Sequence, residues 1–498
     1  MKRLIIISIV TILCNYTKAQ YRHINWCFAD SIGLNFSTTP PAIFECSLTS
    51  YNKSSSISVS CISDETGNLL FYTNGNKVWN KEHNLMQNGS GLFGIWSSDY
   101  PYIYPLIIPK PHDENIYFLF HGSEPVYYSL IDISYNDGLG KVIDKNKLLE
   151  TPWPNNSTHK LNAVKHGNGR DWWIIFPSIY YDWADDSYGL PTLFYILLIT
   201  PEGIIQMPTI EGEIFNEDDN RYDDGQSKFS PDGSMLGLTC GKKVWLYHFD
   251  RCSGVLNYYY TIDSIWTGNP NDYVSGFEFS PDGYKLYITK IGGYNGVSRL
   301  YQYDLNADDI KTSQVIIHQN NSDYSYQQLQ LAPNGKIYAT MPPDNSITYD
   351  SGVPQTMSIS IIHNPNEPGL TCNYEHLGQY IGGKKVEYGL PNMPNYNLGV
   401  LPKSACDTLS TSINNIQEDG TFHIYPNPAF QYISIQSNIE VNEKLKVEIY
   451  NMQGISVYSS DYQINNSVDI SKLNSGVYVV RLLEDNKNIF TENLLILN

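Results

Sequence analysis

A short turn motif that recurs along the chain constrains the fold more than any other feature of the sequence. Phe-Ser-Pro-Asp-Gly stands at residues 229–233 and again at 279–283, and Leu-Ala-Pro-Asn-Gly stands at 331–335. Proline presets the first turn dihedral, and Asp-Gly or Asn-Gly accepts the positive φ of a two-residue hairpin. Apolar and polar residues alternate after each copy, which predicts a strand on either side of the turn. The predicted turn residues are Asp232, Gly233, Asp282, Gly283, Asn334 and Gly335.

The interval between the copies predicts the architecture. The three copies lie about 50 residues apart, and looser copies near 63–72, 111–120 and 167–176 extend the series toward the N-terminus. Four strands with their turns need about this length, so each repeat predicts one blade of a β-propeller. We therefore expect an all-β chain in which residues 20–402 form a propeller of about seven blades, with six or eight as alternatives. The absence of long runs with helical period excludes a helical solenoid.

The first 19 residues are typical of a cleavable secretory signal. Lys2 and Arg3 precede an apolar run that ends at Cys14, and Ala19 is a small residue at the expected cleavage point. Lipidation at Cys14 is a weaker alternative, because Leu13 before it is not small. The apolar run is shorter than the roughly 20 residues that cross a bilayer, so we expect no transmembrane segment.

The composition changes after residue 402. A polar stretch over 403–421 predicts a linker, and residues 422–498 alternate as seven short strands with frequent turns. Such spacing predicts a small Ig-like β-sandwich. The expected organisation is a signal at 1–19, a propeller at 20–402, a linker at 403–421 and a sandwich at 422–498.

Three blocks of this tail carry a resemblance. Tyr-Pro-Asn-Pro-Ala at 425–429, Val-Glu-Ile-Tyr-Asn-Met-Gln-Gly at 447–454 and Leu-Asn-Ser-Gly-Val-Tyr at 473–478 occur in this order. In that order they resemble the type A C-terminal sorting domain of the type IX (Por) secretion system of Bacteroidetes. The residues that match the motif are Tyr425, Pro426, Asn427, Pro428, Gly454, Gly476 and Tyr478.

The resemblance implies an export route and partners. It implies passage through the Sec pathway, then recognition by the type IX translocon and its sortase machinery. It also implies cleavage within 403–421, followed by attachment to the outer cell surface or release.

The large domain is similar to a propeller-like region of secreted, often gliding-associated, surface proteins of Bacteroidetes. The similarity rests on residues 67–75, 78–80, 86–91 and 388–392, and the repeated hairpins are similar to the wider TolB and WD40-like group. It implies a binding or scaffold role toward a protein or glycan and brings no catalytic residues with it.

Charge restricts the partners and cofactors. The formal net charge is −19, which argues against a nucleic-acid partner. One acidic stretch, at 217–225, is a weak candidate for calcium, since calcium takes several oxygen ligands from one loop. A solvated loop is the alternative, and no other cofactor is expected. The candidate ligands are Asp218, Asp219, Asp223 and Asp224.

The cysteines of the exported chain suggest disulfides. Cys240 and Cys252 flank one predicted strand, and Cys46 and Cys61 flank a polar loop, so we expect each pair to form a bridge. The alternative is that these cysteines are unpaired core residues, because spacing alone does not establish the geometry of a bridge.

An enzymatic function is the alternative to binding. A glycoside hydrolase needs two carboxylates held close together, and Glu278 and Glu387 are candidates because they interrupt apolar stretches. An outward-facing or channel-facing strand residue is the simpler interpretation of Glu278. The few arginines of the predicted propeller argue against a sialidase, which needs an arginine cluster for its carboxylate substrate. The expected function is therefore binding, with an extracellular polysaccharide hydrolase as the alternative.

Overall fold

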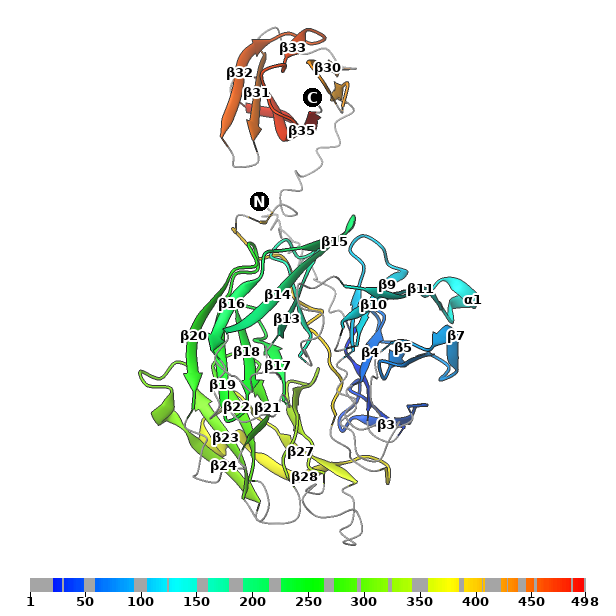
Figure 1. Ribbon diagram of the computed structural model, residues 1–498, viewed down its shortest axis with the longest axis vertical. Coiled ribbons are helices and arrows are strands. Elements are labelled where there is room, and N and C mark those ends of the chain that lie inside the picture. The colour runs from blue at the N-terminus through cyan, green and yellow to red at the C-terminus, as the bar shows by residue number, and fades with distance from the viewer. Residues whose placement is uncertain are drawn as a thin grey trace, which may run out of the picture. The chain divides into compact units, whose positions relative to one another are not determined.

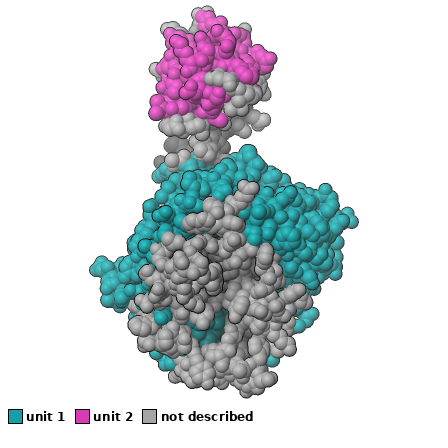
Figure 2. Space-filling view, in the orientation of Figure 1, with its two compact units in different colours: residues 1–410 teal, residues 411–498 magenta. Residues whose placement is uncertain are grey.

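The chain forms two compact units, residues 1–410 and 411–498 (Figure 2). A computed structural model describes residues 21–28, 31–48, 59–93, 105–122, 125–149, 160–178, 191–214, 225–263, 273–292, 297–320, 325–342, 357–384, 389–404, 406–407, 422–427, 429–437, 445–451, 455–484 and 487–496. The predicted signal peptide and most of the predicted linker lie outside these residues. The predicted boundaries at 402 and 422 stay predictions.

The first unit begins with a three-stranded sheet and an eight-stranded sheet (Figure 1). The eight-stranded sheet consists of two four-stranded halves, joined by one parallel pair between Gln87 and Lys141. A short helical turn, α1 (Tyr135–Gly138), precedes the last strand of the second half. The strands are β1 (Asn25–Phe28), β2 (Ile32–Asn35) and β3 (Ala42–Glu45); β4 (Ser60–Ser63), β5 (Leu69–Thr73), β6 (Lys77–Asn80) and β7 (Leu85–Ser90); β8 (Leu106–Pro109), β9 (Ile116–His121), β10 (Tyr127–Asp132) and β11 (Lys141–Leu148).

Four more antiparallel sheets follow in chain order. Three of them have four strands, and in the first of the four an extra strand pairs with β14. Two 3-10 turns, η2 (Lys311–Ser313) and η3 (Gly369–Cys372), lie in the last two sheets. The strands are β12 (Asn162–Lys165), β13 (Trp172–Ser178), β14 (Pro191–Thr200), β15 (Gly203–Gln206) and β16 (Ile210–Ile214); β17 (Ser227–Phe229), β18 (Met235–Cys240), β19 (Lys243–Phe249) and β20 (Leu256–Ile262); β21 (Tyr273–Phe279), β22 (Lys285–Ile291), β23 (Ser298–Asp304) and β24 (Val315–Asn320); β25 (Leu329–Leu331), β26 (Ile337–Ala339), β27 (Ser358–Ile362) and β28 (Tyr374–Tyr380).

These sheets are the blades of a β-propeller. Counting the two halves of the large sheet separately, the described residues form seven blades, in agreement with the predicted number. The first strand of a blade is generally buried, whereas the last strand keeps exposed positions, as in β7 and β28. The ring closes because the first blade packs on the last: Trp26 and Phe36 contact Tyr338 edge to face, at ring distances of 5.8 and 5.5 Å.

The repeated motif forms the turn between the first two strands of a blade, as predicted, but the turn is longer than predicted. Ser230 O accepts a hydrogen bond from Gly233 N at 2.8 Å, so proline and aspartate occupy the two central turn positions. Glycine takes the positive φ, with values of 76°, 77° and 74° at Gly233, Gly283 and Gly335. Ser230 N also donates to Met235 O at 2.8 Å across the turn. The two-residue hairpin was therefore wrong in detail, because glycine follows the two central positions and lengthens the connection.

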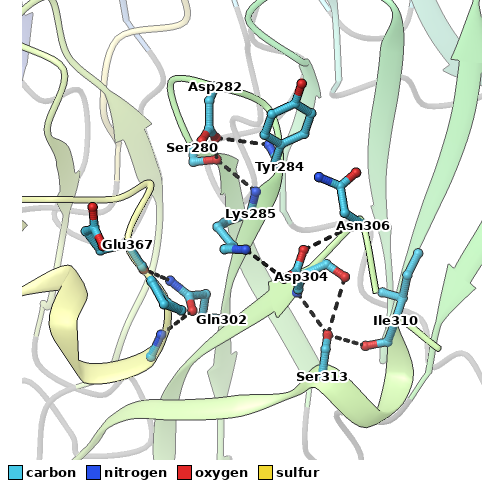
Figure 3. Close-up of polar contacts among 12 residues, drawn as sticks. Ser280, Asp282, Tyr284, Lys285, Gln302, Asp304, Asn306, Ile310, Ser313 and Glu367 are labelled. Carbon is cyan, nitrogen blue, oxygen red and sulfur yellow. Dashed lines mark hydrogen bonds and ion pairs between the residues drawn. The ribbon is translucent and has the colours of Figure 1, made fainter. Parts of the chain in front are cut away.

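Figure 3 shows how the side chains hold one of these turns. Asp282 Oδ1 accepts hydrogen bonds from Ser280 Oγ and Tyr284 N, at 2.5 and 3.1 Å. Ser280 Oγ in turn accepts from Lys285 N at 2.8 Å, and Lys285 Nζ lies 2.7 Å from Asp304 Oδ2 on β23. The motif therefore fixes the turn and links it to the third strand of the blade.

Residues 389–402, here called the closing segment, connect blades that are far apart in sequence. In Figure 1 this amber stretch runs between the blue and the green sheets. Asn392 is its central residue: its backbone N donates to Val59 O, and its Nδ2 donates to Pro105 O and Leu161 O at 3.3 and 3.0 Å. Tyr396 is fully buried, and its hydroxyl donates to Ile107 O at 2.7 Å. The closing segment thus donates hydrogen bonds to backbone carbonyl groups of three blades.

The disulfide of the described residues differs from both predicted bridges. It joins Cys252 to Cys406, which lies just after the closing segment. The predicted Cys240–Cys252 bridge is wrong because Cys240 lies opposite Lys243 at the start of β19, while Cys252 follows the other end of that strand. A seven-residue strand spans roughly 20 Å, whereas bridged Cα atoms lie about 4–7 Å apart.

The predicted Cys46–Cys61 bridge is also wrong. Both thiols are free and buried, and a third cysteine, Cys27, lies beside them. Cys27 N donates to Cys61 Sγ at 3.3 Å, and Cys46 Sγ donates to Ile32 O at 3.2 Å. The thiols are therefore used in packing and in weak hydrogen bonds, as the alternative interpretation expected.

The second unit contains two sheets, as predicted for a small sandwich. The sheets have the strand orders β29-β30-β33 and β32-β31-β34-β35, and their apolar faces share one core. Pro426 follows directly after β29, which agrees with a proline that ends strand pairing. The strands are β29 (Phe422–Tyr425), β30 (Tyr432–Ser437), β31 (Leu445–Asn451), β32 (Ser456–Tyr462), β33 (Ser467–Asp469), β34 (Gly476–Glu484) and β35 (Lys487–Ile496).

The closing segment generates a prediction about stability. Replacement of Asn392 by alanine should lower the free energy of unfolding by about 2–4 kcal/mol, because two carbonyl groups lose their donor. Urea unfolding followed by tryptophan fluorescence measures this change. Asn395→Ala is the matched control: it lies in the same segment, and its hydrogen bond to Pro231 O is exposed, so the loss should be less than about 1 kcal/mol. Equal losses in the two variants would contradict the role of Asn392.

Candidate functional site in the propeller channel

A cavity of about 270 Å³ lies where first strands of five blades converge. The strands β1, β12, β17, β21 and β25 each contribute lining residues, and the closing segment forms part of the wall. The prolines of the three repeated turns lie at the cavity as well: Pro231, Pro281 and Pro333. The repeats therefore build the site as well as the fold.

Three polar side chains in the cavity occupy the same position of the repeat. Lys228, Glu278 and Gln330 each stand two residues before the first residue of the Ser-Pro-Asp-Gly or Ala-Pro-Asn-Gly turn. Lys228 Nζ donates to Glu278 Oε2 at 2.8 Å and to Gln330 Oε1 at 2.5 Å. Three successive blades thus present a cation, an anion and an amide to one another inside the channel.

The ion pair of this group is buried. The side chains of Lys228 and Glu278 are 10% and 6% exposed. Glu278 Oε2 also accepts from Leu331 N at 2.8 Å, and Oε1 accepts from Phe279 N at 3.0 Å. Burial lowers the pKa of Lys228, and the neighbouring carboxylate opposes that shift. The charges therefore neutralise each other, and the local net charge is zero.

His23 adds a polar atom that has no partner among the described residues. It lines the cavity next to Trp26, and its Nδ1 atom is buried without a hydrogen bond, although part of the residue is exposed. Burial lowers the pKa of His23 to about 4, so the imidazole is neutral at pH 7. A buried polar atom without a partner costs about 1–3 kcal/mol unless water or a ligand satisfies it.

The chemistry of the cavity suits an uncharged polar ligand. It offers amide groups, a lysine N–H and a neutral imidazole, and its ion pair has no net charge to attract an ion. Among the described residues that line it, Glu278 is the one carboxylate, and three donors already occupy its oxygens. General acid–base hydrolysis of a glycoside uses two carboxylates.

Aromatic residues of two other strands differ in exposure. Trp172 and Trp173 are buried in the core of β13, whereas Tyr258 and Tyr259 on β20 are exposed. The calcium candidates Asp218, Asp219, Asp223 and Asp224 lie outside the described residues, and so does Glu387. In the part of the chain that the structure describes, no group of three or more His, Cys, Asp or Glu could hold a metal ion.

The residues of the predicted sorting signal are partly at the surface of the second unit. Tyr425 is 66% exposed, and Pro426 and Asn427 are exposed beside it. Tyr478 is buried, and its hydroxyl donates to Asn474 O at 2.9 Å, so this residue supports the fold. Gly476 begins β34. Pro428 and Gly454 lie outside the described residues.

Residues 423–496 match the family model of the secretion system C-terminal sorting domain. The chain thus carries a type IX sorting domain, which implies the type IX machinery as its export partner and an extracellular or outer-surface destination. Among the described residues, no helix has the length and apolar character needed to cross a membrane.

No curated protein matches the chain in sequence. Similar solved structures include a Lactobacillus plantarum protein with 13% identity, covering 74% of this chain and 99% of its own, at a TM-score of 0.44. A periplasmic gluconolactonase of Pseudomonas aeruginosa has 12% identity, coverages of 74% and 99%, and a TM-score of 0.43. A β-propeller domain from Myceliophteria thermophila has 10% identity, coverages of 62% and 85%, and a TM-score of 0.38. Similarities this distant do not bear on the activity of the chain.

The buried ion pair generates a prediction. Lys228→Met should destabilise the protein by about 3–5 kcal/mol, because the carboxylate of Glu278 is left charged and buried. The double variant Lys228→Met/Glu278→Gln should recover at least half of this loss. Thermal or urea unfolding of both variants measures it.

Lys311 provides the matched control, because its pair with Asp263 is about half exposed at a distance of 2.9 Å. Lys311→Met should leave the urea midpoint nearly unchanged, because an exposed ion pair contributes little to stability. The interpretation fails if the double variant is no more stable than Lys228→Met.

Proposed function

We propose that the protein is an exported β-propeller that binds a neutral sugar unit of a glycan in the channel cavity. The observation that carries the proposal is the buried Nδ1 of His23, which has no hydrogen-bond partner among the described residues and belongs to a side chain that lines a polar cavity without net charge. A sugar hydroxyl both donates and accepts hydrogen bonds, so it complements an imidazole, amides and a lysine N–H at the same time. Glycan binding is a function that an exported protein can perform outside the cell.

The size of the cavity restricts the ligand. At about 270 Å³ it lies just below the roughly 300–1,000 Å³ of typical small-molecule sites, so it suits one sugar unit rather than a buried oligosaccharide. The rest of a glycan would extend past the turns at Pro231, Pro281 and Pro333. Hydrolysis receives less support, because Glu278 is the one described carboxylate in the lining and Lys228 neutralises it.

Binding can be tested with the mature chain, residues 20–498. Isothermal titration with glucose, galactose, mannose and N-acetylglucosamine, and with glucuronate as a charged comparison, should detect binding of at least one neutral sugar. His23→Leu should weaken that binding at least tenfold, because it removes the polar atom and leaves a side chain of similar size. His248→Leu is the control, since His248 is an exposed residue of β19. The proposal fails if none of the neutral sugars binds or if His23→Leu binds as well as the parent.

The His23→Leu substitution should weaken sugar binding without lowering the stability of the fold. Without ligand, His23→Leu should leave the free energy of unfolding equal or raise it by about 1 kcal/mol, since an unpaired buried polar atom is removed. The folded pKa of about 4 lies below the usual 6.5, so the parent loses stability as the pH falls from 6.5 toward 4. The advantage of the variant should therefore grow over this range. A constant difference in urea midpoints between pH 7 and pH 4.5 would contradict it.

Export is proposed to depend on the second unit. Deletion of 422–498 should retain the propeller in the periplasm, as fractionation and surface proteolysis would show. A finer variant, Tyr425→Ser with Phe430→Ser, changes two side chains that are 66% and 60% exposed, so the unit should stay folded. Reduced surface display of this variant, with unchanged unfolding of the second unit, would support recognition through the exposed aromatic residues. Normal display after the deletion would rule the route out.

A further inference from the structure

Gln330 uses only one end of its amide group within the channel cavity. Lys228 Nζ donates to Gln330 Oε1 at 2.5 Å, and an ammonium group can only donate, so the amide oxygen must be the atom that faces Lys228. Gln330 Nε2 donates to no residue in the described part of the chain. The side chain lines the cavity and is partly exposed, and Nε2 is not one of the buried atoms without a partner. Its two N–H groups are therefore accessible to a ligand.

The acceptor atoms beside these N–H groups are already in use. Glu278 Oε2 accepts from Lys228 Nζ and Leu331 N, both at 2.8 Å, and Glu278 Oε1 accepts from Phe279 N at 3.0 Å. The oxygen of Gln330 accepts from Lys228. An ammonium group has three N–H donors, of which two are used here. Three donors thus remain unused, whereas every acceptor oxygen of Lys228's two partners already accepts a hydrogen bond.

This balance favours a carbonyl group of the ligand over a hydroxyl group at the same point. A carbonyl oxygen accepts two hydrogen bonds and brings no proton that needs an acceptor. A hydroxyl group would bring such a proton, and a buried donor without an acceptor weakens binding. A carboxylate is disfavoured as well, because the ion pair beside it has no net charge to offset the loss of its hydration.

Apolar residues flank the same donors. Leu331, Ala332 and Pro333 follow Gln330 in the chain and line the cavity, and so does Pro281, which lies in the equivalent turn of the preceding blade. A small apolar group next to the ligand carbonyl can therefore leave water by packing on these side chains. The acetamido group of an amino sugar combines the two features. Its own N–H points away from its carbonyl oxygen, because a secondary amide is trans, so it does not compete for the same position.

We propose that the sugar unit in the cavity is an N-acetylated amino sugar, whose acetamido oxygen accepts from Gln330 Nε2 and whose methyl group packs on Pro281 and Pro333. The inference rests on the proposed binding of a neutral sugar and specifies its class. Gln330 is then a specificity-determining residue, because one end of its amide is fixed and the other contacts the ligand. Lys228 and Glu278 are positioning residues that hold this amide in one orientation.

The experiment compares matched sugars by calorimetric titration of the mature chain, residues 20–498. Each N-acetylated sugar is paired with the hexose that has a hydroxyl group in place of the acetamido group: N-acetylglucosamine with glucose, N-acetylgalactosamine with galactose, and N-acetylmannosamine with mannose. At least one N-acetylated sugar should bind at least tenfold more tightly than its hexose. Similar affinities within every pair would overturn the inference and leave the binding of neutral sugars standing. Absence of binding by all six sugars would overturn the proposed function as well.

A variant tests the role of Gln330. Gln330→Met removes the two donors and keeps a side chain of similar length, so the preference for the N-acetylated sugar over its hexose should fall at least fivefold. Gln319→Met is the matched control: Gln319 Oε1 also accepts from a cation, Arg299 Nε at 2.9 Å, but at an exposed position of β24. Its preference should equal that of the parent. An unchanged preference in Gln330→Met would overturn the role of Gln330.

A measurement on the parent protein does not depend on the folding of a variant. In saturation-transfer NMR with the N-acetylated sugar that binds most tightly, the acetyl methyl protons should receive more saturation than the ring protons, because they are in contact with the cavity wall. Saturation of the methyl group that is no greater than that of the ring protons would overturn the proposed placement.

Discussion

The fold depends on the hydrogen bonds that the closing segment makes in the channel. A propeller is a ring, and its first strands present backbone carbonyl groups toward the axis that no strand of their own blade satisfies. Asn392 and Tyr396 supply donors to three of these strands or their entries, through Val59, Pro105, Leu161 and Ile107. A buried carbonyl group without a donor lowers the stability of the fold. The closing segment therefore connects distant blades and also supplies the hydrogen bonds that carbonyl groups near the propeller axis need.

The part of the channel that the closing segment does not fill becomes the candidate site. There the repeat no longer places apolar residues, and three blades present Lys228, Glu278 and Gln330 to one another. Because these groups satisfy each other, they hold the wall of the cavity in one arrangement with no net charge. Nδ1 of His23, which has no hydrogen-bond partner within the described part of the chain, is then the group that a ligand would satisfy.

The sequence predicted much of the fold because the repeat is local. Turn residues, strand alternation and spacing indicated the blades, and alternation with frequent turns indicated the sandwich. The length of the turn was mispredicted because the residue order does not show which residues take the two central positions. The disulfide was mispredicted for a similar reason: Cys252 and Cys406 are 154 residues apart and meet only because the chain returns along the channel.

The sequence predicted less of the candidate site than of the fold. Glu278 drew attention as a charge between apolar residues, but its partner came from the preceding repeat, at the equivalent position. Aligning the repeats with one another would have placed Lys228, Glu278 and Gln330 in one column and indicated a shared location. No comparable signal exists for His23, because it stands before the first strand at a position that does not recur in the repeats.

The Cys252–Cys406 bond has a consequence for processing. Residues 403–421 are the expected cleavage zone, and Cys406 lies near its start. Any cut after Cys406 would remove the sorting domain while the new chain end stays covalently tied to the propeller. The closing segment, which precedes Cys406, would then stay attached to the propeller near the end of the shortened chain. Loss of the sorting domain would thus leave the ring, and the cavity inside it, as they were before the cut.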